Sequence, residues 1–390
     1  MRGQTRNRVL LAAGAAAVVA GVGAIPSGLV ANAAGHPAPA SHQAGLTSDA
    51  PVTVVASGLE APRDMAWGPD GHLLVSEAGV PTSDCVGSGF TLECFGVNGS
   101  IADISSGTAK PIITGLVTAY NEEEMVGPDA LTYTRGHLYT QETGAPQEIP
   151  SGLPASLTTV LDKQFGALLD VTPHRLSVVA NPGNVDYQWS QAHTNLTSDF
   201  PDADPYGLAA NPRGGFYLAD AASNTLDSID AWGHVQVLAF IPELPNGTDA
   251  VPTCVAAGPD GSVYVGELTG HGNSATAASI YRYSPWTGKL TVWQSGFSAI
   301  DGCGFGAHGN FYATELDTTG FLPPGNPDGA VIQISPDGTR TVLGAGQLLA
   351  PSGFLAGPDG SIYVTNDSII WPAITGTISG PDSGEVVKIG

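Results

Sequence analysis

Positive charge is scarce in this chain. Its 390 residues hold 13 Lys and Arg against 36 Asp and Glu, a formal net charge of −23 at pH 7. A protein this acidic is repelled by nucleic acid and by anionic lipid, which argues against both as partners, and it attracts cations or basic partners. Apolar residues make up 42% of the sequence, enough to bury a sizeable core.

Signatures of catalysis are also missing. The sequence contains no G-x-S-x-G elbow, H-E-x-x-H pair, phosphate-binding loop or dinucleotide fingerprint. Its four cysteines show no C-x-x-C spacing, which argues against zinc and thiol redox chemistry. The motifs therefore do not decide whether the protein is an enzyme.

Long apolar runs are confined to the N-terminus. Three arginines precede an apolar stretch from Val9 to Ala24, and Ala31-Asn32-Ala33 has the form of a cleavage site. This pattern predicts a Sec-type signal peptide over residues 1–33 and a secreted protein without a membrane span. Removing it lowers the formal net charge to about −26. Residues 34–50 are predicted to be a flexible leader and residues 51–390 the folded domain.

Glycine is plentiful, and it punctuates a repeat. Near-copies of GPDGSVYVGELTG, Gly258 to Gly270, occur at six places, and each reads as a turn followed by an alternating strand. Two further strand-like runs follow most of these hairpins. The turn glycines, 47 to 78 residues apart, are Gly71, Gly136, Gly214, Gly261, Gly309 and Gly360. Six units of four strands predict an all-β fold, a six-bladed β-propeller with four-stranded blades.

The two ends of the domain complement each other. The run GEVVKIG, Gly384 to Gly390, stops as a third strand, and PVTVVASG, Pro51 to Gly58, has the fourth-strand pattern. We expect residues 52–57 to pair beside residues 385–389, which closes the ring and removes its exposed edges. The protein is expected to be a monomer.

A polar residue lies six positions after each turn glycine. Because it occurs in every unit, the first interpretation is a scaffold group that accepts hydrogen bonds from the next loop. The alternative is a ligand-binding group at the mouth of the channel. The six residues are Glu77, Glu142, Asp220, Glu267, Glu315 and Asn366.

Departures from the repeat are better candidates for a site. Seven residues before the turn glycine, near the start of the innermost strand, glycine predominates, as a crowded axis requires. Asp64 and Asp129 break this pattern, and Asp301 lies one residue before the glycine of its unit. Oxygen ligands suit a hard cation, so these three aspartates are candidate Ca²⁺ ligands, and a solvated acidic rim is the alternative. The expected acidic mouth also includes Glu77, Glu122, Glu142, Glu267 and Glu315.

The four cysteines predict two disulfides in an exported chain. Cys85 and Cys94 lie nine residues apart in an insertion of the first unit. Cys254 and Cys303 occupy nearly equivalent positions on the innermost strands of units four and five, where adjacent strands approach bridging distance. Free thiols are the alternative for this second pair.

The longest spacing between turn glycines holds an insertion. It covers about Thr143–Phe165 and Asn181–Asp204 and includes Tyr187 and Trp189. Insertions on a propeller frequently carry function, and the alternative is that this one caps the ring.

Whole segments of the chain match one family pattern. They are GLEAPRDMAWGPDGHLLVSEAG, the Cys85/Cys94 insertion, DPYGLAANPRGGFYLADAASN, VPTCVAAGPDGSVYVGELTG and GAVIQISPDGTRTV. On these residues the chain, over residues 50–390, resembles the ScyD/ScyE family of secreted propeller proteins. Single GPDG pieces also resemble NHL-like and lactonase-like propellers. The resemblance implies the fold and export, and no particular chemistry.

Three classes of function compete. The first is a binding or scaffold protein whose acidic mouth takes a small molecule, a glycan or a protein. The alternative is a Ca²⁺-dependent hydrolase or lactonase of the SMP-30-like propeller class. A quinoprotein dehydrogenase ranks last, because an anionic cofactor calls for several basic residues and Arg63 is the only arginine near an inner strand start.

Overall fold

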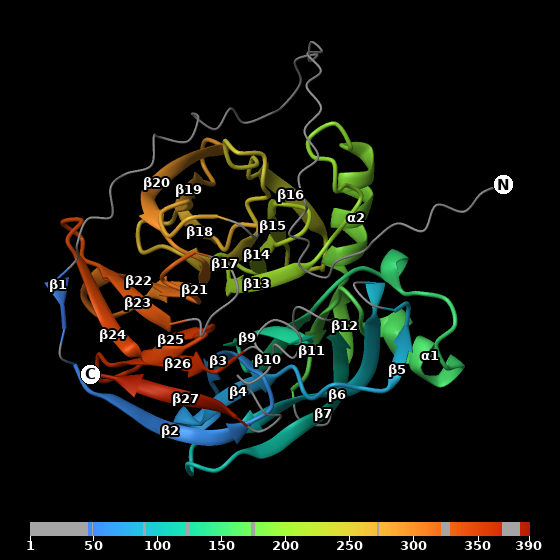
Figure 1. Ribbon diagram of the computed structural model, residues 1–390, viewed down its shortest axis with the longest axis horizontal. Helices are drawn as coiled ribbons and strands as arrows, with labels where there is room; N and C mark the ends of the chain where they lie inside the picture. The colour runs from blue at the N-terminus through green and yellow to red at the C-terminus, as the bar shows by residue number, and fades with distance from the viewer. Residues whose placement is uncertain are drawn as a thin grey trace.

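The computed structural model describes residues 46–48, 50–88, 91–121, 125–172, 176–270, 273–320, 328–368 and 383–390 (Figure 1). The predicted signal peptide and most of the predicted leader lie outside the described residues, and so does Glu122. Six sheets surround one axis, which confirms the six-bladed β-propeller (Figure 1).

Each blade has four strands that run from the axis outward. They are β3 (Pro62–Trp67), β4 (Leu73–Glu77), β6 (Glu93–Asp103) and β7 (Lys110–Tyr120) in blade one, and β9 (Pro128–Thr134), β10 (His137–Glu142), β11 (Leu168–Asp170) and β12 (Ser177–Ala180) in blade two. They are β13 (Pro205–Ala210), β14 (Phe216–Asp220), β15 (Thr225–Ile229) and β16 (Val235–Phe240) in blade three, and β17 (Pro252–Ala257), β18 (Val263–Glu267), β19 (Ala278–Ser284) and β20 (Lys289–Phe297) in blade four. They are β21 (Ile300–Phe305), β22 (Phe311–Glu315), β23 (Asp328–Ile334) and β24 (Arg340–Leu349) in blade five, and β25 (Phe354–Ala356), β26 (Ile362–Asn366), β27 (Gly384–Ile389) and β2 (Val52–Leu59) in blade six.

The turn glycines explain why the repeat folds into hairpins. All six have φ between 76° and 120°, in the region that only glycine enters without strain. Each of these turns reverses the chain between the innermost strand and the second strand of its blade. The glycines therefore set the start of every blade.

The last blade is built from both ends of the chain, as predicted. Strand β2 pairs antiparallel with β27, with Val52 opposite Ile389 and Val54 opposite Val387. A short strand, β1 (Leu46–Thr47), pairs parallel with β24 of blade five. The predicted leader is thus ordered at its C-terminal end.

Aromatic side chains join consecutive blades. Tyr139 of blade two lies edge-on to Phe216 of blade three, with ring centroids 4.8 Å apart. The tyrosine at the same repeat position of blade five, Tyr312, stacks on Phe354 of blade six at 5.1 Å. Such contacts stabilise the ring beyond the area they bury.

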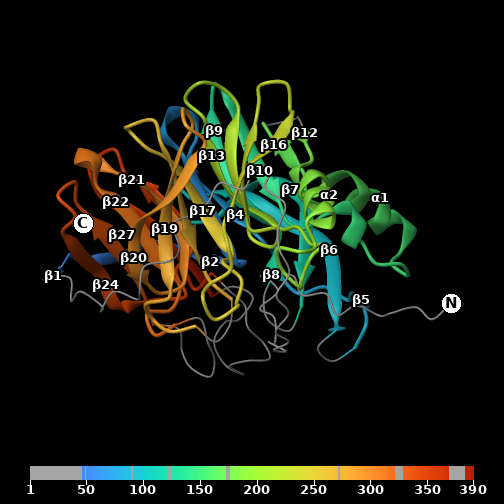
Figure 2. The same cartoon turned by 90° about the horizontal axis from the view of Figure 1, so that it is seen from above.

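The insertion between blades two and three contains two helices, α1 (Ala155–Gln164) and α2 (Pro182–Ala192), at the outer rim of the ring (Figure 2). In blade one, β5 (Asp84–Val86) pairs with β6 and places Cys85 opposite Cys94, which are joined by a disulfide. A short strand, β8 (Met125–Val126), extends β7. Among the helices of the described residues, none has the length and apolar character that crossing a membrane requires.

Deleting residues 50–58 removes the strand that closes the ring and leaves β27 as an open edge. We expect aggregation or a fall in melting temperature of about 10 °C or more, because several kcal/mol of burial and pairing are lost. Differential scanning calorimetry of the truncated protein measures this. An unchanged melting curve contradicts closure by β2.

Candidate functional site

A β-bulge near the start of the inner strand selects the side chains that face the channel. In blade two Pro128 pairs with Glu142 and Ala130 with Gln141, so Asp129 has no residue opposite it. Blades one, three, four and five show the same shift in register. A bulge re-aims the extra side chain. The bulged residues and their counterpart in blade six line one cavity: Arg63, Asp129, Tyr206, Thr253, Asp301 and Ser352. We call these six residues the channel ring.

The register of one predicted residue is corrected by this pattern. Counting from the turn glycine placed Asp64 level with Asp129, but Asp64 lies one residue further along its strand, level with Ala130. The count fails because the turn of blade two is shorter than that of blade one. Counting from the proline that opens five of the six inner strands gives the correct ring, and that proline is the signal the sequence offered.

The level just beyond the channel ring is crowded by neighbouring backbone. A Cβ on Gly207 would lie 2.4 Å from the carbonyl oxygen of Thr253, and one on Gly302 would lie 2.3 Å from that of Ser352. Glycine is required at these positions for that reason. The channel is therefore wide enough for polar side chains only at the ring itself.

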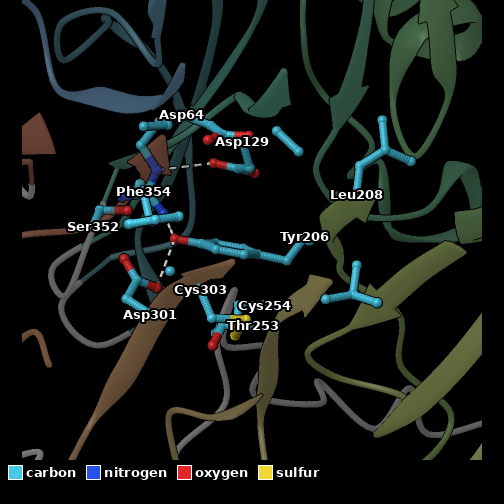
Figure 3. Close-up of a pocket in the computed structure, with 16 residues that line it drawn as sticks. Asp64, Asp129, Tyr206, Leu208, Thr253, Cys254, Asp301, Cys303, Ser352 and Phe354 are labelled. Atoms are coloured by element: carbon cyan, nitrogen blue, oxygen red, sulfur yellow. Dashed lines mark hydrogen bonds and ion pairs between the residues drawn. A yellow bond between two sulfur atoms is a disulfide. The ribbon is translucent and has the colours of Figure 1, made fainter. Parts of the chain in front are cut away.

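Arg63 is the centre of the channel ring (Figure 3). Its Nε donates to Asp129 Oδ1 at 3.1 Å, and its Nη2 donates to the Tyr206 hydroxyl. The Tyr206 hydroxyl in turn donates to Asp301 Oδ1 at 3.0 Å. Arg63 is only 1% exposed, so this chain of hydrogen bonds links blades one, two, three and five inside the protein. The sequence stage treated Arg63 only as an isolated base and missed this role.

The three predicted aspartates line the same cavity of about 370 Å³, a volume that includes its open part. Asp64 Oδ1 accepts the N–H of Met65 at 2.8 Å, and its Oδ2 accepts that of Leu131 at 2.9 Å. Burial raises the pKa of Asp64 to about 7 and that of Asp129 to about 8, against the opposing effects of backbone N–H groups and of Arg63. Both carboxyls therefore exchange protons near neutral pH.

The geometry does not fit a calcium ion. Arg63 already neutralises Asp129, Asp301 is held by Tyr206, and both oxygens of Asp64 are turned to backbone N–H groups. In the part of the chain that the structure describes, no three His, Cys, Asp or Glu side chains are arranged to hold a metal ion. The positive charge that the aspartates require is supplied by the chain itself.

The glutamates expected at the mouth are buried instead of exposed. Glu77, Glu142, Glu267 and Glu315 are at most 5% exposed. Glu315 Oε1 accepts the N–H of Ser298 at 2.8 Å, just before the inner strand of its blade. Asn366 accepts the N–H of Leu349 in the same way at 2.7 Å. These contacts support the scaffold interpretation of the repeated position.

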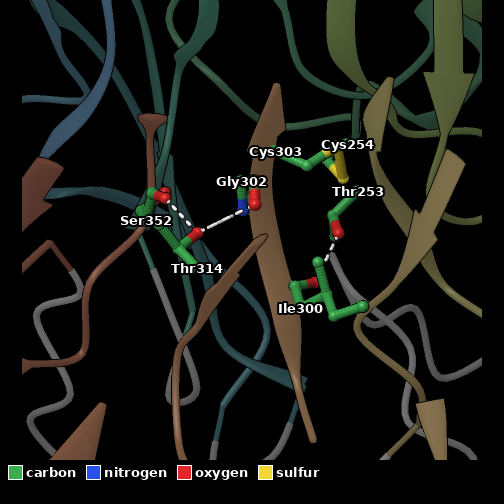
Figure 4. The surroundings of a disulfide bond; sticks show 7 residues. All are labelled: Thr253, Cys254, Ile300, Gly302, Cys303, Thr314 and Ser352. Atoms are coloured by element: carbon green, nitrogen blue, oxygen red, sulfur yellow. Dashed lines mark hydrogen bonds between the residues drawn. A yellow bond between two sulfur atoms is a disulfide. The ribbon is translucent and has the colours of Figure 1, made fainter. Parts of the chain in front are cut away.

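A second disulfide braces the wall of the cavity (Figure 4). It joins Cys254 of β17 to Cys303 of β21, whose Cα atoms lie 5.6 Å apart. Beside it the Thr253 hydroxyl donates to the carbonyl of Ile300 at 2.7 Å. Blades four and five are thus linked covalently where both line the channel, as the sequence predicted.

Comparison with known proteins gives the fold. No family model matches the chain, and no curated protein matches it. Many solved structures do. A proposed gluconolactonase has a TM-score of 0.51 at 13% identity, over 89% of this chain and 94% of that one. Regucalcin from Agrobacterium tumefaciens, described as calcium-binding, gives 0.49 at 14%, over 87% and 94%. Virginiamycin B lyase from Staphylococcus aureus gives 0.44 at 14%, over 82% of each chain.

At these identities the likeness is one of architecture, a propeller of the SMP-30, gluconolactonase and NHL type. It transfers no activity, because one propeller supports unrelated functions. The resemblance to the ScyD/ScyE family stays an expectation from the residues.

The Cys254–Cys303 bridge closes a loop with a sequence separation of 49. Replacing both cysteines by alanine should lower the free energy of unfolding by about 4 kcal/mol in the chain-entropy view, measured by denaturant titration. The matched control, alanine at Cys85 and Cys94, opens a loop with a separation of 9 and should cost about 3 kcal/mol. A larger loss in the control would contradict the bracing role.

Glu267 tests the scaffold interpretation. Its Oε2 accepts the N–H of Ser279 at 2.7 Å inside blade four, and the side chain is fully buried. Glu267→Ala should lower the free energy of unfolding by about 1–3 kcal/mol with or without added Ca²⁺, since a buried donor is left without its acceptor. A variant as stable as the wild type would show that the repeated carboxylate is not a structural tie.

Proposed function

We propose that this protein is a ligand-binding propeller whose channel ring takes a compact organic cation with several N–H donors. The observation that carries the proposal is a pair of buried acceptors in one cavity. Asp129 Oδ2 and Asp301 Oδ2 have no hydrogen-bond partner among the described groups. Buried carboxylate oxygens without donors are costly, and a ligand that supplies donors removes the cost.

The charge of the cavity favours a cation. Three aspartates line it with a single arginine, so it is negative when all are ionised. The whole chain is also acidic, which raises the local concentration of cations around it. A planar guanidinium group matches carboxylates on opposite sides of a channel better than a spherical metal ion does.

The affinity for such a ligand should rise with pH. The pKa of Asp64 is about 7 and that of Asp129 about 8 in the empty channel, because both are buried. A cation binds the ionised forms, so below these values it must first displace protons. Binding should therefore strengthen from about pH 6 to about pH 9 and then level off.

The alternative is a Ca²⁺-dependent hydrolase or lactonase. It keeps the same three aspartates as metal ligands and requires Arg63 to leave Asp129. Elemental analysis of the purified protein and calcium-dependent melting separate the two functions.

The direct test is calorimetric titration with methylguanidinium, which stays charged across this pH range, and with its neutral isostere methylurea. A ligand of this size should bind with a Kd of about 0.1–10 mM, and methylurea should bind at least about tenfold more weakly. Asp301→Asn should abolish measurable binding, because it removes one charge while the amide oxygen still accepts from Tyr206. Asp162→Asn, on the exposed face of α1, is the matched control and should bind as the wild type does.

Two results would overturn the proposal. One is equal binding of methylguanidinium and methylurea, which would remove the role of charge. The other is tight stoichiometric Ca²⁺ that Asp64→Asn and Asp129→Asn eliminate, which would favour the hydrolase.

A further inference from the structure

Helix α2 buries a carboxyl group that the channel does not use. Asp186 lies one turn into the helix, is fully buried, and has no hydrogen-bond partner for either carboxyl oxygen among the described groups. Its carboxyl interacts with those of Asp220, at the end of β14, and Asp227, on β15. Both of these are fully buried as well. Three segments of the chain thus meet at one group of carboxyls, which we call the α2 cluster.

Only part of the α2 cluster is satisfied by the protein. Asp220 Oδ1 accepts the N–H groups of Asp204 at 2.9 Å and Ser223 at 2.7 Å. Asp227 Oδ2 accepts the hydroxyl of Thr225 at 3.0 Å. The other oxygen of each, Asp220 Oδ2 and Asp227 Oδ1, has no partner among the described groups. Four carboxyl oxygens therefore face one another without a donor.

The charged neighbours do not supply one. The segment that enters β13 contributes Asp204, whose Oδ1 accepts the Thr143 hydroxyl at 2.7 Å and whose nearest cation is Arg63 of the channel ring. The remaining titratable groups beside α2 are His193, stacked on Trp189 at 4.2 Å, and Glu148 of the 3₁₀ turn η3 (Pro146–Glu148), whose Oε2 accepts the N–H of Ala145. Each of these has its own partner.

Three ionised carboxylates cannot stay together in a buried site without compensation. Burial and mutual repulsion raise the pKa of Asp186 and of Asp227 well above the ordinary carboxyl range, and burial raises that of Asp220 to about 7. A proton on one carboxyl supplies the missing donor, since its O–H can bond the oxygen of the next.

We propose that α2 is a pH-gated clamp: protons shared by Asp186, Asp220 and Asp227 hold it against blade three, and their loss to solvent releases it. The sign follows from linkage. A carboxyl that binds protons more tightly in the docked state favours docking at low pH and loses this contribution as pH rises through neutrality.

The rest of α2 shows what release would change. Its N-terminal end sits on blade two, where a Cβ on Gly183 would lie 2.1 Å from the carbonyl oxygen of Gly144. Nearer its C-terminal end Trp189 packs on Phe240 of β16, with ring centroids 5.8 Å apart, and on Phe200 at 6.1 Å. The helix therefore bridges blades two and three, and its release would expose these aromatic side chains.

Hydrogen exchange on the full chain tests the clamp. Protection of the amides in residues 182–192, corrected for intrinsic rates and compared with the buried strand β22, should fall between about pH 5 and about pH 9. The opening equilibrium should grow about tenfold per pH unit for each proton released. Asp186→Asn carries a permanent N–H donor and should flatten this dependence, while Asp162→Asn on α1 should leave it unchanged.

Each other outcome decides against the clamp. A wild-type profile that is independent of pH overturns it, and so does an Asp186→Asn variant that keeps the slope. Protection restored at alkaline pH by millimolar Ca²⁺ and removed by EDTA would show that a metal ion, not protons, closes the cluster. If Asp186→Asn does not fold, Asp227→Asn tests the same cluster from blade three, and the wild-type profile still decides. None of these results depends on what the channel ring binds.

Discussion

The approach of six inner strands to one axis is the constraint on which the rest of the molecule depends. At the level of Gly207 and Gly302 a single Cβ would meet the backbone of the next blade. The chain can place larger side chains near the axis only where a bulge turns them into the space before this level. A repeat that is almost uniform elsewhere is therefore free to vary at the channel ring, and that is where arginine, tyrosine and two aspartates appear together.

The acidity of the protein is partly internal. In an acidic chain the expectation is a solvated, negative mouth, yet Glu77, Glu142, Glu267 and Glu315 are buried and Glu77 accepts the N–H of Glu60 at 3.0 Å. Carboxylates suit this task because one oxygen can accept a backbone N–H where a blade begins, at a point where no strand supplies an acceptor. The cost of burying them is met in different ways, by N–H groups in the scaffold, by Arg63 in the channel and by shared protons under α2.

The sequence predicted the architecture because its signals are local. Positive φ at the turn glycines and the alternation of apolar residues need no tertiary information, and ring closure follows from the incomplete last unit. Both cysteine pairs also followed from position in the repeat. The channel ring was predicted only in part, because Asp64 was counted from a turn whose length differs between blades. Arg63 was missed because its partners, Asp129 and Tyr206, come from other blades.

The α2 cluster was invisible at the sequence level for a related reason. Asp186 lies in an insertion that follows no repeat, and nothing in its neighbours along the chain indicates burial. Asp220 was recognised only as one of six scaffold acceptors. The contact between them depends on how the insertion docks on blade three, which is a property of tertiary packing.

Ring closure by β2 also determines the order in which the protein can fold. Val52 and Ile389 are opposite each other in the last sheet, so the first strand of the domain stays without its partner until the final strand has been made. Blades two to five are each built from one continuous stretch of chain and can form earlier, since local contacts close sooner than distant ones. Throughout synthesis the chain carries an unpaired β-strand at its leading end, the kind of segment that invites pairing with a second molecule. Whatever delays the last blade thus extends the time during which the protein is open to misassembly.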